Sequence, residues 1–455
     1  MQSPTTSPAG GRRSIVRTEL GQLLTLAWPV VASRLGIMAM GLIDVIIVGR
    51  YSATQLGYHA LGWAPTSVVL TTAIGLLVGI QVMTARAIGE GRREATGAVL
   101  RRGLSYSVQI GFVSMAVLFV LGPPLMHNIG LEADLADGAS AVLRVFSLSM
   151  PLYALSVAAS LWLEGQAKPG PVAAATWGAN LVNLALGLLL TPGSLGLPAF
   201  GAVGAAWATV GARAFLSIAL LVFIVRMPQA RAWGVFDKPP RDLVAESRQR
   251  QVGYGAGASN FFETAAFAGM NVIAGWISGL TVAGWAVMLN VVAIVFMIPL
   301  GLSTAGAVTV GRAYGARDAA GVRRAGLLVF AVALVVSIAA ALIIWPAARP
   351  IAQAYTTDAA TIALAAPALA LSCLFLIPDA LQVVVSQALR ARGDVLVPSC
   401  THLASYIFVM PPLAWWLAIP LGLGLNGIVW AVIAASFAAA GLLLGRFWML
   451  SRQPL

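Results

Sequence analysis

The sequence predicts an all-α integral membrane protein with twelve transmembrane helices in two six-helix lobes. Three observations support this class: a lipid-like composition, twelve apolar segments of membrane-spanning length, and an internal repeat. Of the 455 residues, 59% are hydrophobic and only 10% are charged, and the mean hydropathy is +0.87. Soluble domains carry about 25% charged residues, so most of this chain is expected to lie in lipid.

Apolar segments long enough to cross a hydrocarbon core of about 30 Å as helices recur along the whole chain. The first six are expected at residues 20–48, 59–85, 104–124, 142–163, 171–192 and 202–227. The second six are expected at residues 253–279, 285–311, 325–346, 362–389, 397–418 and 424–450. The N-terminal 19 residues lack an apolar stretch with a small-residue cleavage site. The first span is therefore expected to remain as a helix and not to be removed as a signal peptide.

An internal repeat divides these spans into two sets of six. "TARAIGEGRREATGAVLRRG" at 84–103 resembles "TVGRAYGARDAAGVRRAG" at 309–326 with an offset of 225. "VGAAWATV" at 203–210 resembles "NGIVWAVI" at 426–433 with an offset of 223. Six helices return the chain to its starting side, so the halves should be parallel and related by a pseudo-two-fold axis along the membrane normal. A substrate cavity is expected near the midplane between the two lobes.

The predicted domain organisation follows from these spans and from the polar segments that flank them. We expect a cytoplasmic N-terminal tail at 1–19, an N-terminal lobe at 20–227, a cytoplasmic linker at 228–251, a C-terminal lobe at 252–450 and a C-terminal tail at 451–455.

The distribution of basic residues predicts the orientation. With the N-terminus inside, 23 of the 28 Lys and Arg residues fall in inner segments, and only Arg50, Arg144 and Arg349 fall in outer ones. Basic residues near helix ends stay in the cytoplasm, so both termini should face it, in a multi-pass protein of the plasma membrane, the inner membrane in a bacterium. Anionic lipid headgroups account for the net charge of +12, so no nucleic-acid partner is predicted. We expect a monomer.

The residues needed for metal sites, disulfides and enzymatic chemistry are scarce. Cys373 and Cys400 lie in predicted spans without paired spacing, and His59, His127 and His402 are scattered. Neither a disulfide nor a zinc site is therefore predicted, and no cofactor is expected apart from a coupling ion. No HExxH or GxSxG motif lies in a span, so the chain is not expected to be an enzyme.

Two acids are expected at matched depth in the C-terminal half. Asp379 lies about ten residues from the inner end of the tenth span, and Glu263 lies about ten residues from the inner start of the seventh. Intramembrane acids are costly and face a cavity or a partner, and neither acid has a base within two turns of its own helix. Pro378 leaves the carbonyl of Leu374 without its helical donor. The pair is predicted to couple ions, by taking up H⁺ or by forming a Na⁺ site. The alternative is that each acid merely pairs with a neighbouring base.

Asp44 is a third candidate ion-coupling acid. It lies nearer the outer end of the first span, where an interfacial acid is an alternative interpretation. Arg34 is ten residues earlier, about 15 Å along a helix axis, and cannot pair with Asp44 directly. Trp177, Asn180 and Asn183 form a polar stripe on the fifth span, which either lines a cavity or joins helices.

Polar and aromatic stripes on the predicted helices indicate where a substrate could bind. The candidate cavity-lining residues are Asn180, Asn183, Trp177, Asn260, Phe267, Phe375, Gln382 and Asn290. Met270, Met288 and Phe262 add adaptable apolar surface, which is typical of broad selectivity.

Several of these stretches resemble the multidrug and toxic compound extrusion (MATE) family, in its NorM-like branch, from about Pro29 to Trp448. The matching stretches are "MGLIDVIIVG", "GAVGAAWAT", "LNVVAIVFMIPLGLSTAGAVTVGRAYGA", "PDALQVVVSQALRARGD" and "LGLGLNGIVWAVIAA". The resemblance implies an antiporter in which H⁺ or Na⁺ enters while a lipophilic, mainly cationic small molecule leaves the cytoplasm by alternating access. It also implies that Asp44, Glu263 and Asp379 are the acids of the family's helices 1, 7 and 10.

Three positions depart from the family pattern. Gly187 stands where many members have Asp or Asn, Arg34 stands where the branch usually has Gln, and Phe375 replaces a frequent Tyr. The N-terminal lobe thus has one acid fewer and one positive charge more. This favours Glu263 and Asp379 as the coupling site.

The alternative function is a flippase for lipid-linked precursors of the same superfamily. A carrier of anionic headgroups should line its cavity with basic residues. Only Arg34 and Arg213 lie in predicted spans, against three acids. The charge pattern therefore favours export of cations.

Overall fold

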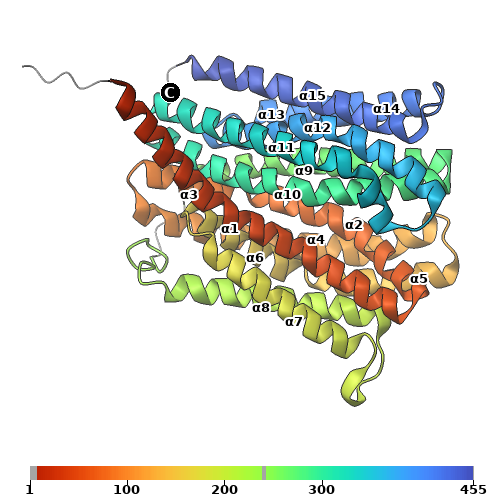
Figure 1. The fold of residues 1–455 in the computed structure, drawn as a ribbon. Coiled ribbons are helices and arrows are strands. Elements are labelled where there is room, and N and C mark those ends of the chain that lie inside the picture. Colours follow the sequence, from red (N-terminus) through yellow and green to blue (C-terminus); the bar gives the residue numbers. More distant parts are fainter. Residues whose placement is uncertain (1–7, 238–241, 454–455) are drawn as a thin grey trace, which may run out of the picture.

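The computed structural model describes residues 8–237 and 242–453, and all regular structure within these ranges is helical (Figure 1). The first half comprises α1 (Pro8–Tyr51), α2 (Ala53–Leu77), α3 (Gly79–Gly89), η1 (Arg93–Ala95), α4 (Thr96–Asn128), α5 (Ala133–Leu148), α6 (Met150–Gly165), α7 (Gly170–Leu190), η2 (Ser194–Gly196) and α8 (Gly201–Arg226). The second half comprises α9 (Leu243–Ile277), α10 (Gly279–Gly315), α11 (Ala319–Tyr355), α12 (Ala359–Arg392), α13 (Leu396–His402), the π-helical stretch η3 (Leu403–Val409), α14 (Met410–Ala418) and α15 (Gly424–Ser451).

Each of the twelve predicted spans coincides with a helix or with consecutive helices. Within the described ranges, ten helical segments are long and apolar enough to cross a membrane. The pair α5 and α6, bent by 43°, makes an eleventh. The remaining predicted span is α9, which is 35 residues long but is less apolar because it carries the polar stripe with Asn260 and Glu263. The predicted architecture of two six-helix lobes is confirmed.

The two lobes lie side by side, with their helices running in roughly one direction (Figure 1). Helices α2–α8 occupy the lower half of the view and α9–α15 the upper half, while α1 crosses the front and packs against both α7 and α10. The start of α1 and the end of α15 lie at the same end of the bundle. We call this the terminal end. The end of α8 and the start of α9 must also lie there, because an even number of passes precedes each.

Helix boundaries depart from the prediction at the terminal end. Helix α1 begins at Pro8 and not at residue 20, and α9 begins at Leu243 and not at residue 253. Asp242 caps α9, because its carboxylate accepts a hydrogen bond from the backbone N–H of Ala245 at 2.9 Å. Hydropathy marks only the part of a helix that lies in lipid, whereas these helices continue past it with polar turns.

The contacts between the lobes reveal the register of the repeat. Gly75 of α2 packs against Gly257 of α9, and Gly301 of α10 packs against Val31 of α1. Gly301 and Gly257 each follow their counterparts in the first half by 226 residues. The offset of 225 predicted from the 84–103 segment is therefore wrong by one residue, because that segment was aligned on its threonines and not on its arginines.

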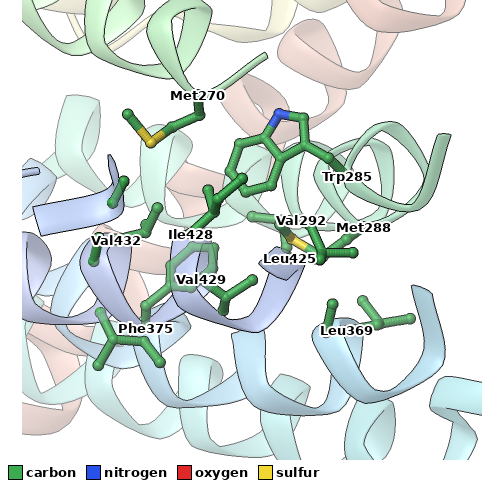
Figure 2. Packing of buried hydrophobic residues seen from close by; sticks show 14 of the residues in the cluster. Met270, Trp285, Met288, Val292, Leu369, Phe375, Leu425, Ile428, Val429 and Val432 are labelled. Atoms are coloured by element: carbon green, nitrogen blue, oxygen red, sulfur yellow. The ribbon is translucent and has the colours of Figure 1, made fainter. Parts of the chain in front are cut away.

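The C-terminal lobe has a dense apolar core. Phe375 and Trp285 have no exposed surface, and they pack with methionine and aliphatic side chains from α9, α10, α12 and α15 (Figure 2). Lipid tails are as apolar as this core, so close van der Waals packing holds the helices together within the membrane. The core fixes the facing surfaces of α9 and α12, on which the predicted acids lie.

The lobes touch closely from the terminal end towards the middle of the bundle. A methyl group at Gly79 would overlap the carbonyl oxygen of Gln249, and one at Gly253 would overlap that of Leu76. Arg86 of α3 donates hydrogen bonds of 3.0 Å to the carbonyl oxygens of Ala391 and Arg390. The two lobes are therefore closed against each other at this end.

Candidate functional site

Two carboxylates meet within the C-terminal lobe. The amide nitrogen of Gln382 lies 3.3 Å from Oδ1 of Asp379 and 3.5 Å from Oε1 of Glu263, so one side chain of α12 joins its own acid to the acid of α9. Asp379 is 5% exposed. The structure thus brings together the two acids for which the sequence predicts a matched depth.

Tyr406 completes this cluster, which we call the acid pair site: Glu263, Asp379, Gln382 and Tyr406. The Tyr406 hydroxyl lies 3.5 Å from Oδ1 of Asp379, and Tyr406 belongs to the π-helical stretch η3. Such stretches are rare and often occur at functional sites. The ring of Phe267 lies 6.4 Å from that of Tyr406 and 6.5 Å from that of Trp285, so aromatic side chains wall the site on one side.

The acid pair site has the donor atoms that a small hard cation prefers. Oε1 of Gln382 is buried without a hydrogen-bond partner, and the amide nitrogen of the same side chain contacts both carboxylates. Pro378 lies inside α12 and cannot donate to the carbonyl of Leu374. Hard cations take oxygen ligands, and a proton shared between the acids would satisfy the same oxygens. The residues therefore fit either H⁺ or Na⁺ as a transported ion.

No base neutralises the acid pair site by direct contact. Among the described residues, none of the ion pairs includes Glu263 or Asp379. The described residues also hold no group of three or more His, Cys, Asp and Glu side chains suited to a metal ion. The interpretation in which each acid merely pairs with a neighbouring base is therefore not supported by the geometry.

Asp44 lies in a separate polar cluster in the N-terminal lobe. Its Oδ1 accepts a hydrogen bond from Asn183 at 3.0 Å, and its Oδ2 accepts one from Thr209 at 2.7 Å. Asp44 is 3% exposed, so it is an interior residue and not an interfacial one. Arg213, one turn after Thr209 on α8, donates to Ser149 and stacks over the ring of Tyr153 at 4.9 Å.

A cavity of about 620 Å³ lies next to Asp44. It is lined mainly by α1, α2, α6 and α8, with Asn290 of α10 and Tyr355 of α11 contributed by the other lobe. Tyr355 lies at the end of the bundle opposite the termini. The polar lining of the cavity includes Arg34, Asp44, His59, Arg213 and Asn290, among many apolar residues. The cavity therefore lies largely in the N-terminal lobe, not centrally between the lobes as expected.

The predicted cavity-lining residues divide into three groups. Asn290 lines the cavity. Asn180, Asn183 and Asn260 join helices: Asn180 donates to the carbonyl of Gly36 at 2.9 Å, and Asn260 donates to that of Thr71 at 3.0 Å.

The third group is aromatic or belongs to the acid pair site. Phe375 is wholly buried in the apolar core and lines no open space, so its predicted role is not met in this structure. Trp177 is 47% exposed on the outer surface of α7, and Phe267 and Gln382 lie at the acid pair site.

Sequence reasoning missed one buried ion pair. Arg34 of α1 lies 3.2 Å from Oε1 of Glu164 on α6, and Gln81 of α3 donates to the other carboxylate oxygen at 3.1 Å. Glu164 is 2% exposed. An unmatched arginine in the first span and an acid in "LWLEGQ" were the available signals, but 130 residues separate them.

The helical architecture, the paired lobes and the buried polar clusters define the class of the protein: a multi-pass membrane transporter. The chain belongs to the MatE family, whose model matches residues 29–189 and 256–416, one match in each lobe. It is 60% identical over 438 residues to the "Probable multidrug resistance protein NorM" of Caulobacter vibrioides, covering 96% of this chain and 93% of that protein. It is a NorM-like multidrug resistance transporter of the MATE family.

More distant relatives agree with this assignment. The chain is 31% identical to "Multidrug resistance protein PmpM" of Pseudomonas aeruginosa, covering 94% of this chain and 88% of that one. Its fold matches the crystal structure of the eukaryotic MATE transporter AtDTX14 with a TM-score of 0.86, at 18% identity and over 96% of each chain.

Proposed function

We propose that the protein is a cation-coupled multidrug efflux antiporter, in which H⁺ or Na⁺ enters while a lipophilic, mainly cationic compound leaves by alternating access. The observation that supports this most directly is the joining of Glu263 and Asp379 through Gln382, in a buried place where no ion pair among the described residues includes either acid. Two carboxylates held together repel each other when both are ionised, so a proton or a metal cation bound between them is stabilised.

Ion uptake and drug release are linked through the two lobes. The cavity beside Asp44 lies largely in the N-terminal lobe and the acid pair site lies in the C-terminal lobe, so a cationic drug at one and an ion at the other are exchanged when the lobes move against each other. Each elementary charge that crosses the membrane provides about 2.3 kcal/mol per 100 mV. A monovalent cationic drug that leaves costs the same electrical energy, so a one-for-one exchange is driven by the concentration gradient of the ion, which provides about 1.4 kcal/mol per tenfold ratio.

The substrate class is inferred from the cavity. Met38, Met40 and Trp63 give it adaptable apolar walls, and Asp44 gives it one buried carboxylate. Lipophilic cations suit such a surface, because flexible methionines and aromatic rings accommodate many shapes.

The flippase alternative is less well supported. Its anionic headgroup would need free basic groups in the cavity. Arg34 is bonded to Glu164, and Arg213 shares the cavity with Asp44. Each cavity arginine is thus matched by an acid.

The proposed location is the bacterial inner membrane with the terminal end in the cytoplasm. The relatives are bacterial multidrug resistance proteins, and the inner segments hold 23 of the 28 basic residues. No nucleic-acid partner and no resident cofactor are proposed, and the transporter is proposed to act as a monomer.

Transport in vesicles tests the proposal. Efflux of an ethidium-like cation should be driven by an imposed pH gradient or an imposed Na⁺ gradient, applied separately. Asp379→Asn and Glu263→Gln should each abolish gradient-driven efflux while the protein still inserts, since losing a buried charge lowers the insertion cost. If the acids act as one site, the double variant should be no worse than either single variant.

A matched control is Asp137→Asn, since the Asp137 side chain is 76% exposed. It should transport at the wild-type rate. Wild-type rates and unchanged ion dependence in both acid variants would overturn the proposal. Failure of the acid variants to insert would indicate that the acids hold helices together.

A further inference from the structure

Arg390 is a buried positive charge whose side chain lacks full pairing. It lies near the end of α12 and is 2% exposed, and its Nε and Nη2 atoms are buried without hydrogen-bond partners. No ion pair among the described residues includes it. An uncompensated buried charge costs several kcal/mol. Its position in the interior, and not in an inner loop as the charge count assumed, requires an explanation.

The repeat identifies the counterpart of Arg390 in the N-terminal lobe. Arg390 follows Glu164 by 226 residues, the same offset that relates the contacts between the lobes. Ala167 and Gly393, which follow the ends of α6 and α12 with positive φ angles of 61° and 109°, differ by 226 residues as well. Helices α6 and α12 therefore correspond residue by residue at this end.

The two lobes carry opposite charges on corresponding helices: Arg390 takes the position of Glu164, while Glu263 lies one turn beyond the position that corresponds to Arg34. In the N-terminal lobe a base of α1, Arg34, pairs with an acid of α6, Glu164. Helix α9 corresponds to α1, because Gly257 follows Val31 by 226 residues. In the C-terminal lobe the acid is on α9, Glu263, and the base is on α12, Arg390.

The two pairs differ in their state. Arg34 and Glu164 are in contact at 3.2 Å, and Gln81 supports the carboxylate. Glu263 is held by Gln382 at 3.5 Å, Arg390 lies about two turns after Gln382 on α12, and no ion pair among the described residues joins Arg390 to Glu263. Arg34 and Glu164 thus form an ion pair, whereas Glu263 and Arg390 do not.

We propose that Arg390 is a positioning residue that supplies the counter-charge of the acid pair site when its ion leaves. This inference rests on the proposed function. With H⁺ or Na⁺ bound, the charge of Glu263 is neutralised, and Arg390 does not contact its carboxylate. When the proton or Na⁺ departs, the carboxylate of Glu263 keeps the electron pair and its negative charge, and Arg390 closes on it as Arg34 does on Glu164.

The backbone of Arg390 links this movement to the contact between the lobes. Arg86 of the opposite lobe donates hydrogen bonds to the carbonyl oxygens of Arg390 and Ala391, each at 3.0 Å. A shift of Arg390 towards Glu263 therefore acts on the end of α12 that the other lobe holds. Ion release at the acid pair site would therefore change the contact between the lobes at the terminal end.

Other polar groups surround Arg390 and the acids from the facing elements. Tyr406 bonds Asp379, and the ring of His402 lies 5.6 Å from that of Tyr406, with both of its nitrogens buried and unpartnered. Tyr406 and His402 are titratable as well. For this reason the test includes Na⁺ at fixed pH as well as H⁺.

The test measures how strongly the ion binds, separately from transport. Purified protein in nanodiscs is titrated with Na⁺ at fixed pH and with H⁺ in the absence of Na⁺, while its tryptophan fluorescence is followed. In Arg390→Gln the ion concentration that gives half of the fluorescence change should fall about tenfold or more. Removing a positive charge near a cation site raises the affinity of that site on this scale. Turnover in vesicles should slow, since the ion is released less readily. Arg390→Lys should restore the wild-type midpoint.

The controls separate this inference from the proposed function and from misfolding. Arg226→Gln removes an exposed arginine at the end of α8 and should leave the midpoint unchanged. If Arg390→Gln fails to insert, Arg390→Met removes the unpaired charge with an apolar side chain. An ion response in wild type that vanishes in Glu263→Gln, with an unchanged midpoint in Arg390→Gln or Arg390→Met, would overturn the role of Arg390 alone. Absence of any ion response in wild type would overturn both proposals.

Discussion

Gly89 and Gly315 make reciprocal contacts across the interface between the lobes. A methyl group at Gly89, the last residue of α3, would overlap the carbonyl oxygen of Arg312. A methyl group at Gly315, the last residue of α10, would overlap the carbonyl oxygen of Arg86. The lobes can approach this closely only because both positions lack a side chain. Closure at the terminal end therefore depends on two glycines.

The first prediction is that Gly89→Ala and Gly315→Ala each destabilise the closed arrangement of the lobes. Overpacking a tight contact costs about 1–3 kcal/mol, which shifts the balance towards opening at the terminal end. A cysteine at Ser160, which lines the cavity, should then react faster with an impermeant thiol reagent added from that end. The measurement needs a background without Cys373 and Cys400.

Gly445→Ala is the matched control for both glycine variants. No heavy atom lies within 4 Å of the methyl group that it would introduce on α15, so its labelling rate should equal that of the parent. Equal labelling of Gly89→Ala and the control would show that the reciprocal contact does not limit opening.

The second prediction concerns Asp44→Asn. Asparagine has nearly the same shape, and a flipped Asn183 amide could bond it, so the cluster with Thr209 should persist. We expect drug efflux to fall by up to about tenfold, about 1.4 kcal/mol, which is less than in Asp379→Asn. Efflux that is abolished in Asp44→Asn but intact in Glu263→Gln would move the coupling site to the N-terminal lobe.

The third prediction is topological. Reporter fusions at either terminus and in the segment between α8 and α9 should all report the cytoplasm, because basic residues concentrate in the segments at that end. A periplasmic signal from the segment between α8 and α9 would contradict the orientation. Fusion between α7 and α8 should report the opposite side and serves as the control.

The fourth prediction tests the core of the C-terminal lobe. Phe375→Ala should cost about 3–5 kcal/mol, because it opens a cavity among side chains that have no exposed surface. Phe437 on α15 is 57% exposed, so Phe437→Ala should cost less than about 1 kcal/mol. Thermal unfolding in detergent compares the two variants. Similar losses of thermal stability in the two variants would indicate that Phe375 contributes no more to stability than an exposed phenylalanine.

The fold and the acid pair were predictable because both follow from properties of single helices. Membrane-spanning length and hydropathy locate each span, and counting residues from the inner ends of two spans predicts the common depth of Glu263 and Asp379. The proline inside α12 was also readable from the sequence. Gln382 was expected on the same stripe as Asp379, although its contact with both acids needs the packed helices.

The missed features depend on which helices face each other. Arg34 meets Glu164 only because α1 crosses the N-terminal lobe next to α6, a proximity that hydropathy does not encode. Arg390 was counted as an inner-loop base, since a charge near a span end normally reaches water. The structure buries it because α12 continues to Arg392, and Arg86 of the opposite lobe donates a hydrogen bond to the carbonyl of Arg390.

The reciprocal contact of Gly89 and Gly315 has the form of an isologous dimer interface, in which residue i of one subunit meets residue j of the other and the reverse also holds. A half-length ancestor that paired about a two-fold axis would have had this contact twice by symmetry. Two copies joined in one chain need not stay identical. Here the two glycines keep reciprocal partners, while the corresponding positions of Glu164 and Arg390 carry opposite charges. One chain can therefore hold a fixed ion pair in one half and, as we propose, an exchangeable one in the other.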